Sequence, residues 1–460
     1  MPRDISPSHE LIAHFLKDNG YGETLAQFEK EHGKPIQPKL LNNVESLSDI
    51  IEDRLNYNTL VEELNKSNID SVAENLPPAL KAIADSQFED WISPFPHTPR
   101  QLDGISALIL SSAYDAATGD VYFTTNDGRV LLRSRDEEIK SFKLGEIIKK
   151  VMIIDNQETI ALLAMSGMLY LKRTRSLESI SQFATGSRFV VDAQYIRLGK
   201  EDYIVTLAWN NSLKLSRVKA KEKQVEQVSE LKLNQQGTCF GLTIYRDRLV
   251  LLLGKLDNTL LEVYTLEGEV EEEDGKNKFE LKYKISINDA EFTTASFSPR
   301  RIIIWNSGEH AGEIPLVAVA TSHEPYMRVI ITSLIDFDAV TSTSTSTEIR
   351  RNQIIRNLNT MSPQDKFSQP IIAWRLGTEK NNNNKVSGIW VMGDDGVIRG
   401  MDVVSGDVAV ELKDDITNTG QGQSKSQTNH GKIKEFIGFV DQNRETLISC
   451  AVDKSITQWT

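Results

Sequence analysis

Short apolar runs rich in β-branched residues, separated by polar turns, recur along the chain from about residue 104 to its end. Each unit has two apolar strands, a tight polar turn and a third strand in which apolar and polar residues alternate. The second strands and their turns align at seven places, residues 121–128, 160–167, 204–211, 250–258, 317–324, 389–396 and 447–454. Their spacing is about 40 residues where no insertion intervenes, the length of a four-stranded blade. The pattern therefore predicts an all-β propeller of seven blades.

The turns after these second strands support the alignment. Asn-Asp-Gly, Ser-Gly, Asn-Asn, Asp-Asn and Asp-Asp-Gly occupy five of them, and these residues accept the positive φ that two-residue hairpins require. Four longer insertions are polar or of low complexity, and we expect them to be flexible loops. They are residues 269–278, 341–347, 381–384 and 417–430.

The end of the repeats predicts how the ring closes. Earlier copies are followed by a candidate fourth strand, for example 138–144 and 408–412, whereas the sequence stops directly after the third strand of the seventh copy, 455–459. A propeller must pair its last blade with its first or leave an open edge. Before the first copy, the extended stretch is 91–102, whose prolines suit an edge strand. We expect this stretch to pair with 455–459.

The first ninety residues show a helical pattern instead. Ser6 and Pro7 can begin a helix that Gly20 ends, and a second helix is predicted from Gly22 to His32. Two helices this short bury too little to be stable alone, so their apolar face needs a partner. A second copy of the chain is the simplest one. Residues 46–65 and 79–90 predict further helices, and the former could extend a dimer interface or bind a partner helix.

The stretch 9–33 resembles a LisH motif. The matching residues are Leu11, Ile12, Phe15, Leu16, Gly20, Tyr21, Thr24, Leu25, Phe28 and Glu31. The resemblance implies a dimerising helical pair, of a kind that often precedes a WD-repeat propeller. The dimer contacts would then come from Leu11, Ile12, Phe15, Leu16, Tyr21, Leu25 and Phe28. An alternative is that this helical hairpin packs on its own propeller.

The repeats resemble WD repeats, most clearly in the last copy, where Asp453, Ile456 and Trp459 match the family pattern. No Gly-His pair opens a blade and no Trp-Asp pair ends one, so we expect a diverged, WD40-like propeller. The predicted organisation has three parts. A LisH-type dimerisation motif spans 1–35, a helical extension with a proline-containing linker spans 36–95, and the propeller spans 96–460.

Charge narrows the possible partners. The net charge is −13, and residues 1–90 hold 17 acidic against 8 basic residues, while the remainder holds 48 against 44. Direct nucleic-acid binding needs a basic stripe, so it is not expected. The sequence has no apolar run long enough to span a membrane and no secretory signal. Its two cysteines favour an intracellular protein of the cytoplasm, the nucleus or both, with buried thiols.

The sequence offers no recognisable chemistry. Phosphate loops, zinc-ligand spacings and nucleophile elbows are missing, and the seven histidines show no metal spacing. We therefore expect a non-enzymatic protein without cofactor or metal. A propeller hydrolase is the alternative from another class, and it would need acids and bases converging at the centre of the ring.

Binding is expected on the propeller face that carries the turns between second and third strands. The candidate residues are Asn126, Arg129, Trp209, Asn210, His323, Tyr326 and Lys454, since exposed Trp and Tyr are favoured interface anchors. Trp209 could instead pack between blades. The predicted function is a scaffold that dimerises and recruits proteins into a multiprotein complex, with a ubiquitin ligase as the lead. A transcriptional corepressor, chromatin or RNA-processing complex is the alternative.

Overall fold

The computed structural model contains two compact units, Met1–Asn75 and Leu76–Thr460. It describes residues 7–36, 46–48, 51, 76–91, 93–154, 158–267, 278–288, 297–306, 313–337, 348–376, 385–413, 431–441 and 444–460. Most of the predicted helix 46–65 and nearly all of the four insertions lie outside these residues. None of the described helices is long and apolar enough to cross a membrane.

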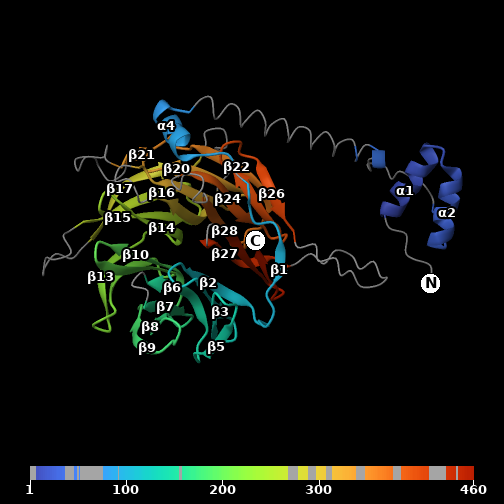
Figure 1. Cartoon of the computed structure of the whole chain (residues 1–460). Helices are drawn as coiled ribbons and strands as arrows, with labels where there is room; N and C mark the ends of the chain where they lie inside the picture. The colour runs from blue at the N-terminus through green and yellow to red at the C-terminus, as the bar shows by residue number, and fades with distance from the viewer. Residues whose placement is uncertain are drawn as a thin grey trace. The chain divides into compact units, whose positions relative to one another are not determined.

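Two contacting helices form the first unit, α1 (Pro7–Asp18) and α2 (Gly22–His32), as the sequence predicted (Figure 1). The end of α1 explains the turn between them. The N–H of Gly20 donates to the carbonyl of Lys17 at 3.1 Å, and the N–H of Tyr21 donates to that of Leu16 at 2.8 Å. This is a Schellman ending, which needs the positive φ of 75° that Gly20 adopts.

The second unit is the predicted seven-bladed propeller, and its sheets follow one another around a ring in chain order (Figure 1). Blade 1 consists of β2 (Ile109–Asp115), β3 (Asp120–Thr125), β4 (Arg129–Arg133) and β5 (Ile139–Lys143). Blade 2 consists of β6 (Ile148–Ile154), β7 (Thr159–Ala164), β8 (Met168–Arg173) and β9 (Ser179–Ala184). Blade 3 consists of β10 (Val190–Leu198), β11 (Glu201–Ala208), β12 (Ser212–Lys219) and β13 (Gln224–Lys232).

The remaining blades keep this order. Blade 4 consists of β14 (Gly237–Tyr245), β15 (Arg248–Lys255), β16 (Leu260–Glu267), β17 (Lys278–Ser286) and a short fifth strand, β21 (Ile349–Arg350). Blade 5 consists of β18 (Pro299–Trp305), β19 (Leu316–Thr321), β20 (Tyr326–Ser333) and β22 (Arg356–Pro363). Blade 6 consists of β23 (Ile371–Leu376), β24 (Val386–Met392), β25 (Ile398–Asp402) and β26 (Val408–Leu412). Blade 7 consists of β27 (Ile433–Asp441), β28 (Arg444–Ala451), β29 (Ile456–Trp459) and β1 (Pro99–Gln101).

The first strand of each blade lies innermost. These strands contact one another in the closed sequence β2, β6, β10, β14, β18, β23, β27 and back to β2. The second strands are almost fully buried, which explains their continuous apolar runs. The turns that follow them contain a positive φ in six blades, at Gly128, Gly167, Asn211, Asp257, Gly396 and Lys454. These turns therefore have the positive φ that the sequence pattern predicted for them.

Blade 7 is built from both ends of the unit. Strand β1 pairs antiparallel with β29, with Pro99 opposite Trp459 and Gln101 opposite Thr457. The N–H of Leu102 extends the pairing by donating to the carbonyl of Ile456 at 2.8 Å. The indole N–H of Trp459 donates to the hydroxyl of Ser449 at 3.0 Å, so the closing tryptophan of this repeat is anchored to the neighbouring strand. The segment 91–102 thus supplies the outer strand of the last blade.

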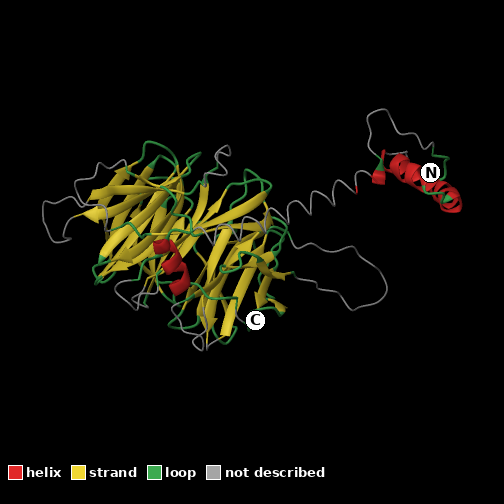
Figure 2. Ribbon diagram, turned by 90° about the horizontal axis from the view of Figure 1, so that it is seen from above, coloured by secondary structure: helices red, strands yellow, loops and turns green. Residues whose placement is uncertain are grey.

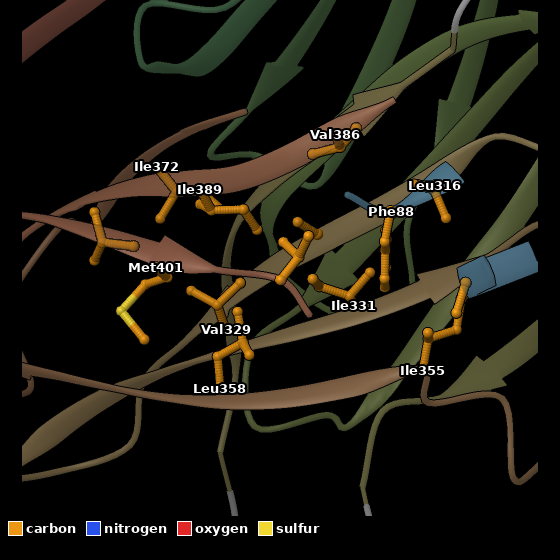
Figure 3. Packing of buried hydrophobic residues seen from close by; sticks show 14 of the residues in the cluster. Phe88, Leu316, Val329, Ile331, Ile355, Leu358, Ile372, Val386, Ile389 and Met401 are labelled. Atoms are coloured by element: carbon orange, nitrogen blue, oxygen red, sulfur yellow. The ribbon is translucent and has the colours of Figure 1, made fainter. Parts of the chain in front are cut away.

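A helix before the repeats, α4 (Pro78–Gln87), belongs to the propeller unit (Figure 2). Its residues Leu80, Ile83 and Ala84, with Phe88 just beyond, are buried against blades 5 and 6. Figure 3 shows Phe88 among apolar side chains of these blades, including Leu316, Val329 and Val386. The second unit therefore begins well before residue 96, where the sequence pattern placed the boundary. The sequence predicted a helix at 79–90 but not its place in the propeller, because its core partners lie more than 200 positions away.

Both cysteines are buried and free. Burial raises the pKa of Cys239 to about 12 and that of Cys450 well above its usual value. Neither thiol is therefore ionised near neutral pH. Since the thiolate is the nucleophilic form of cysteine, both side chains are unreactive.

Candidate protein-interaction face of the propeller

One face of the propeller, the upper face, carries the turns between second and third strands and the connections between blades. In six blades the residue after the second strand donates its N–H to the carbonyl of the residue that precedes the inner strand, at 2.8–3.0 Å. The donor and acceptor pairs are Asn126 and Leu108, Met165 and Ile147, Trp209 and Phe189, Leu256 and Gln236, Ser322 and Ser298, and Val452 and Lys432. This bond fixes the two residues of each pair side by side.

Trp209 lies on this face with 64% of its surface exposed, so it does not pack between blades. Its neighbour Asn210 is also exposed and accepts a hydrogen bond from the hydroxyl of Ser212 at 2.7 Å. Asn126 is exposed, but its side-chain oxygen accepts the N–H of Leu108 at 3.1 Å. Trp209 is thus the predicted site residue with the largest free apolar surface.

The two charged candidates, Arg129 and Lys454, differ in how far their side chains are free to bind a partner. Arg129 forms an ion pair with Asp127 at 2.7 Å, and the hydrogen bond from Arg129 lowers the pKa of Asp127 to about 2. Lys454 is exposed at its turn, where it adopts a positive φ of 74°. Arg129 therefore stabilises its own turn, whereas Lys454 projects from a turn that its neighbours order.

His323 and Tyr326 flank the corresponding turn of blade 5. His323 is half-buried, its ring lies 4.3 Å from that of Phe297, and its Nδ1 is 2.7 Å from the hydroxyl of Thr321. Burial lowers the pKa of His323 to about 4, with a smaller effect of Arg328. His323 is thus a neutral structural residue at neutral pH. Tyr326 keeps 39% of its surface exposed.

Sequence reasoning missed most of the apolar surface of this face. Phe189 is 70% exposed, Phe367 is 76% exposed, and Ile147, Met165 and Val452 also belong to the exposed apolar residues. All five lie in connections between blades or in turns after second strands, and all but Phe367 lie directly before an inner strand or directly after a second strand. Their signal is positional, because an apolar residue directly before an inner strand or directly after a second strand lies outside the blade core.

Charged side chains also gather around the inner strands. Lys150 forms an ion pair with Asp192, and Arg301 approaches the same carboxylate at 3.7 Å. Glu435 accepts hydrogen bonds from both the N–H and the hydroxyl of Ser112 at 2.9 Å. Burial raises the pKa of Glu435, although the charges of Arg301 and Lys150 oppose the shift. The carboxylates of Asp192 and Glu435 are thus each held by neighbouring side chains of the inner strands.

Within the described residues, no group of three or more His, Cys, Asp or Glu side chains could hold a metal ion. The ion pairs and hydrogen bonds of the inner strands link different blades, since Asp192 of blade 3 pairs with Lys150 of blade 2 and approaches Arg301 of blade 5.

In the helical unit, six of the candidate dimer residues are half-buried. These are Leu11, Ile12, Phe15 and Leu16 on α1, and Leu25 and Phe28 on α2. Tyr21, in the turn between the helices, is 53% exposed. Ala13, His32 and Ile36 fill the small interior between them. The apolar stripe of a single chain therefore keeps part of its surface exposed to solvent.

Comparison with known proteins agrees with this division. The beta-propeller domain model of the family UCP007778 matches residues 70–460, and the LisH domain model of the same family matches residues 9–37. The chain belongs to this family. It is also 24% identical over 445 residues to the uncharacterized protein YGR117C of Saccharomyces cerevisiae, covering 86% of this chain and 87% of that protein. The resemblance to LisH and propeller proteins is thereby confirmed.

Proposed function

We propose that this protein is a non-enzymatic scaffold that dimerises through its helical unit and recruits other proteins on the upper face of its propeller. The observation that carries the proposal is the distribution of exposed apolar side chains. Of the twelve large hydrophobic residues exposed in the described parts of the chain, seven lie on the upper face. They are Ile147, Met165, Phe189, Trp209, Tyr326, Phe367 and Val452. Gathered apolar exposure of this kind is typical of interaction surfaces.

The helical unit supports the dimerising half of the proposal. Its two helices are eleven and twelve residues long, shorter than helices that are stable alone in water. The half-buried apolar stripe on both helices is a surface that a second copy could cover, and most soluble dimers have two-fold symmetry. A few hundred Å² of apolar surface buried per chain, at about 25 cal/mol/Å², is sufficient for such an association.

Replacing Leu16 and Phe28 together by Asp is expected to convert a dimer into a monomer. Both substitutions place a charge in the interface, where it would lose hydration without a partner. Light scattering of the full chain measures the mass, and circular dichroism checks that the propeller remains folded. The matched control replaces Lys17 and Lys30 by Asp, because both are exposed positions on the same helices. A wild-type chain that is already monomeric at high concentration would contradict the dimer.

Recruitment is tested by affinity purification of the tagged full chain. We expect stoichiometric protein partners to co-purify, and we expect the monomeric double variant to retain those that bind the propeller. The identity of the partners decides between the candidate complexes. Ubiquitin-ligase subunits would support the leading assignment, and corepressor, chromatin or RNA-processing subunits would support the alternative. A chain that purifies alone would overturn the scaffold.

A further inference from the structure

Six of the seven inner strands contain a β-bulge at an equivalent place near the upper face. On the upper face, the residue before each of these strands accepts a hydrogen bond from the residue after the second strand. The bulged residue lies two positions after this acceptor, as Lys149 does after Ile147. The bulged residues are Leu110, Lys149, Val191, Thr238, Arg300 and Lys434. A bulge redirects a side chain relative to the regular strand. Since the inner strands form a closed ring, these six positions lie at one level around its upper end.

Three of the bulged residues are cations and none is acidic. Lys149, Arg300 and Lys434 form no ion pair among the described residues. Lys149 donates to main-chain carbonyls of blade 3, including that of Val191 at 2.9 Å, and Lys434 lies 3.5 Å from the side-chain oxygen of Gln369. Neutral oxygens therefore hold these two ammonium groups in place without neutralising their charge.

Arg300 completes the set on the other side of the ring. Its Nη2 donates to the main-chain carbonyl of Lys366 at 3.2 Å, while its Nε is buried with no hydrogen-bond partner. Burial lowers the pKa of Lys149, the charge of Asp192 opposes this shift, and the charges of Lys150 and Lys434 lower the pKa further. The nearby carboxylate of Asp192 is already shared by two other cations. The bulged positions at the upper end of the inner ring thus carry three cations and no carboxylate.

The largest apolar surface of the upper face adjoins these cations. In blades 2 and 3, both members of the hydrogen-bonded pair are large and apolar, Ile147 with Met165 and Phe189 with Trp209. Lys149 lies two residues from Ile147, and its ammonium group also donates to the carbonyl of Val190, which follows Phe189. The apolar pairs and the cation are therefore contiguous.

Arg188 and Glu146 are the charged residues of the connections that carry Ile147 and Phe189. Arg188, directly before Phe189, is exposed and forms no hydrogen bond or ion pair with the described residues. Glu146 is the acidic residue in these connections and turns, and it accepts hydrogen bonds from the hydroxyls of Ser166 and Tyr170. Its carboxylate is thus engaged within blade 2, whereas the guanidinium of Arg188 is available to a ligand.

We propose that blades 2 and 3 bind a short peptide segment of a partner protein that combines large apolar side chains with carboxylates. The apolar side chains would lie on Phe189, Trp209, Ile147 and Met165, and the carboxylates would reach Lys149 and the other bulge cations. Apolar anchors beside charge-assisted hydrogen bonds give both affinity and specificity. This inference rests on the proposed scaffold function and adds the place and the chemistry of recognition.

The test uses a display library of random twelve-residue peptides, selected on the full chain. We expect enrichment of sequences that contain Trp, Phe or Leu together with Asp or Glu. Binding of the most enriched peptide is then measured by fluorescence polarisation. Lys149→Glu, and separately Phe189→Ala with Trp209→Ala, should each weaken binding at least tenfold, and raising the salt concentration should weaken it further.

Matched controls are Lys143→Glu on the outer strand β5 and Val404→Ala in a turn at the opposite end of the blades, because both residues are exposed. Neither should change peptide binding more than twofold. Enrichment of basic peptides, no enrichment, or binding that tolerates the blade 2 and 3 variants would each overturn the inference. A single-stranded oligonucleotide that binds while the peptide does not would overturn it as well.

The two proposals fail differently. If the tagged chain brings down partners that the Phe189 and Trp209 variant still binds, the scaffold function stands and this site is wrong. If the tagged chain brings down no partner, the scaffold function itself fails, whatever the peptide selection shows.

Discussion

A chain that begins at Gly104 is expected to lose cooperative unfolding at ordinary temperatures, whereas a chain that begins at Leu76 should melt like the full-length protein. The shorter chain retains all seven second strands but lacks β1, α4 and Phe88. Fully burying one large apolar side chain contributes about 1.5–3 kcal/mol, and at least three are lost here, Leu80, Ile83 and Phe88. That loss approaches the 5–15 kcal/mol that stabilises a typical domain. Thermal melts followed by circular dichroism measure it.

A point substitution in β1 separates the contribution of this closing strand to stability from that of α4. Thr98 and Thr460 exchange both main-chain hydrogen bonds at 3.1 Å. Because hydrogen-bonded and non-bonded pairs alternate in an antiparallel ladder, Arg100 and Gln458 form the next bonded pair. Arg100→Pro removes the donor and should cost about 1–3 kcal/mol, since the carbonyl of Gln458 loses its partner.

The neighbouring position supplies the control for this substitution. The N–H of Gln101 points away from β29, as does the backbone of Pro99, so Gln101→Pro should be nearly neutral. Arg100→Ala accounts for the lost ion pair with Glu137, which is exposed and contributes little. Equal destabilisation by the two proline substitutions would show that the edge pairing of β1 does not hold the ring closed.

Much of the propeller could be predicted because each blade repeats the same local requirements. A buried second strand needs a continuous apolar run, and the turn after it needs a residue that tolerates a positive φ, such as Gly167 or Asn211. Both requirements are visible within about ten residues of sequence. The closing strand was also predictable, because a missing fourth strand in the last blade implies a donor elsewhere in the chain.

The contribution of α4 could not be predicted in this way. Its apolar residues Leu80 and Ile83 pack on strands more than 200 positions away, and no local pattern identifies such a partner. The interaction face was only partly predictable for a related reason. Trp209 was recognisable at the end of a second strand, but Phe189 becomes its neighbour only through the hydrogen bond between a turn and a connection. The bulges that align Lys149 and Lys434 depend on strand register, which the sequence does not display.

The chain just before β1, at Trp91 and Pro94, contacts a buried polar cluster of blades 6 and 7. Arg375 and Glu445 form an ion pair at 3.1 Å, with side chains only 4% and 6% exposed. Arg375 also donates to the main-chain carbonyl of Pro94 at 3.2 Å, and its guanidinium lies 4.3 Å from the ring of Trp91. The second carboxylate oxygen of Glu445 accepts the indole N–H of Trp390 at 2.7 Å. This one carboxylate therefore satisfies two buried donors.

Glu445→Ala is expected to destabilise the propeller by about 3–5 kcal/mol, the usual cost of leaving a buried charge without its partner. Burial raises the pKa of Glu445 in spite of the neighbouring Arg375, so desolvation outweighs the attraction between them. The pair is thus costly to form, and Arg375 is left in an equally dry place when the carboxylate is removed. Urea denaturation of the full chain measures the change.

Glu411→Ala is the matched control for this substitution. Glu411 also pairs with a buried arginine, Arg399, but its own side chain is 37% exposed and Arg399 keeps a second carboxylate, Asp395. Its removal should therefore cost no more than about 1 kcal/mol. If Glu445→Ala and Glu411→Ala unfold at the same urea concentration, the pair of Arg375 and Glu445 does not hold Trp91 and Pro94 against blades 6 and 7. If only Glu445→Ala shifts, the segment from Trp91 to Pro94 depends on this carboxylate through Arg375.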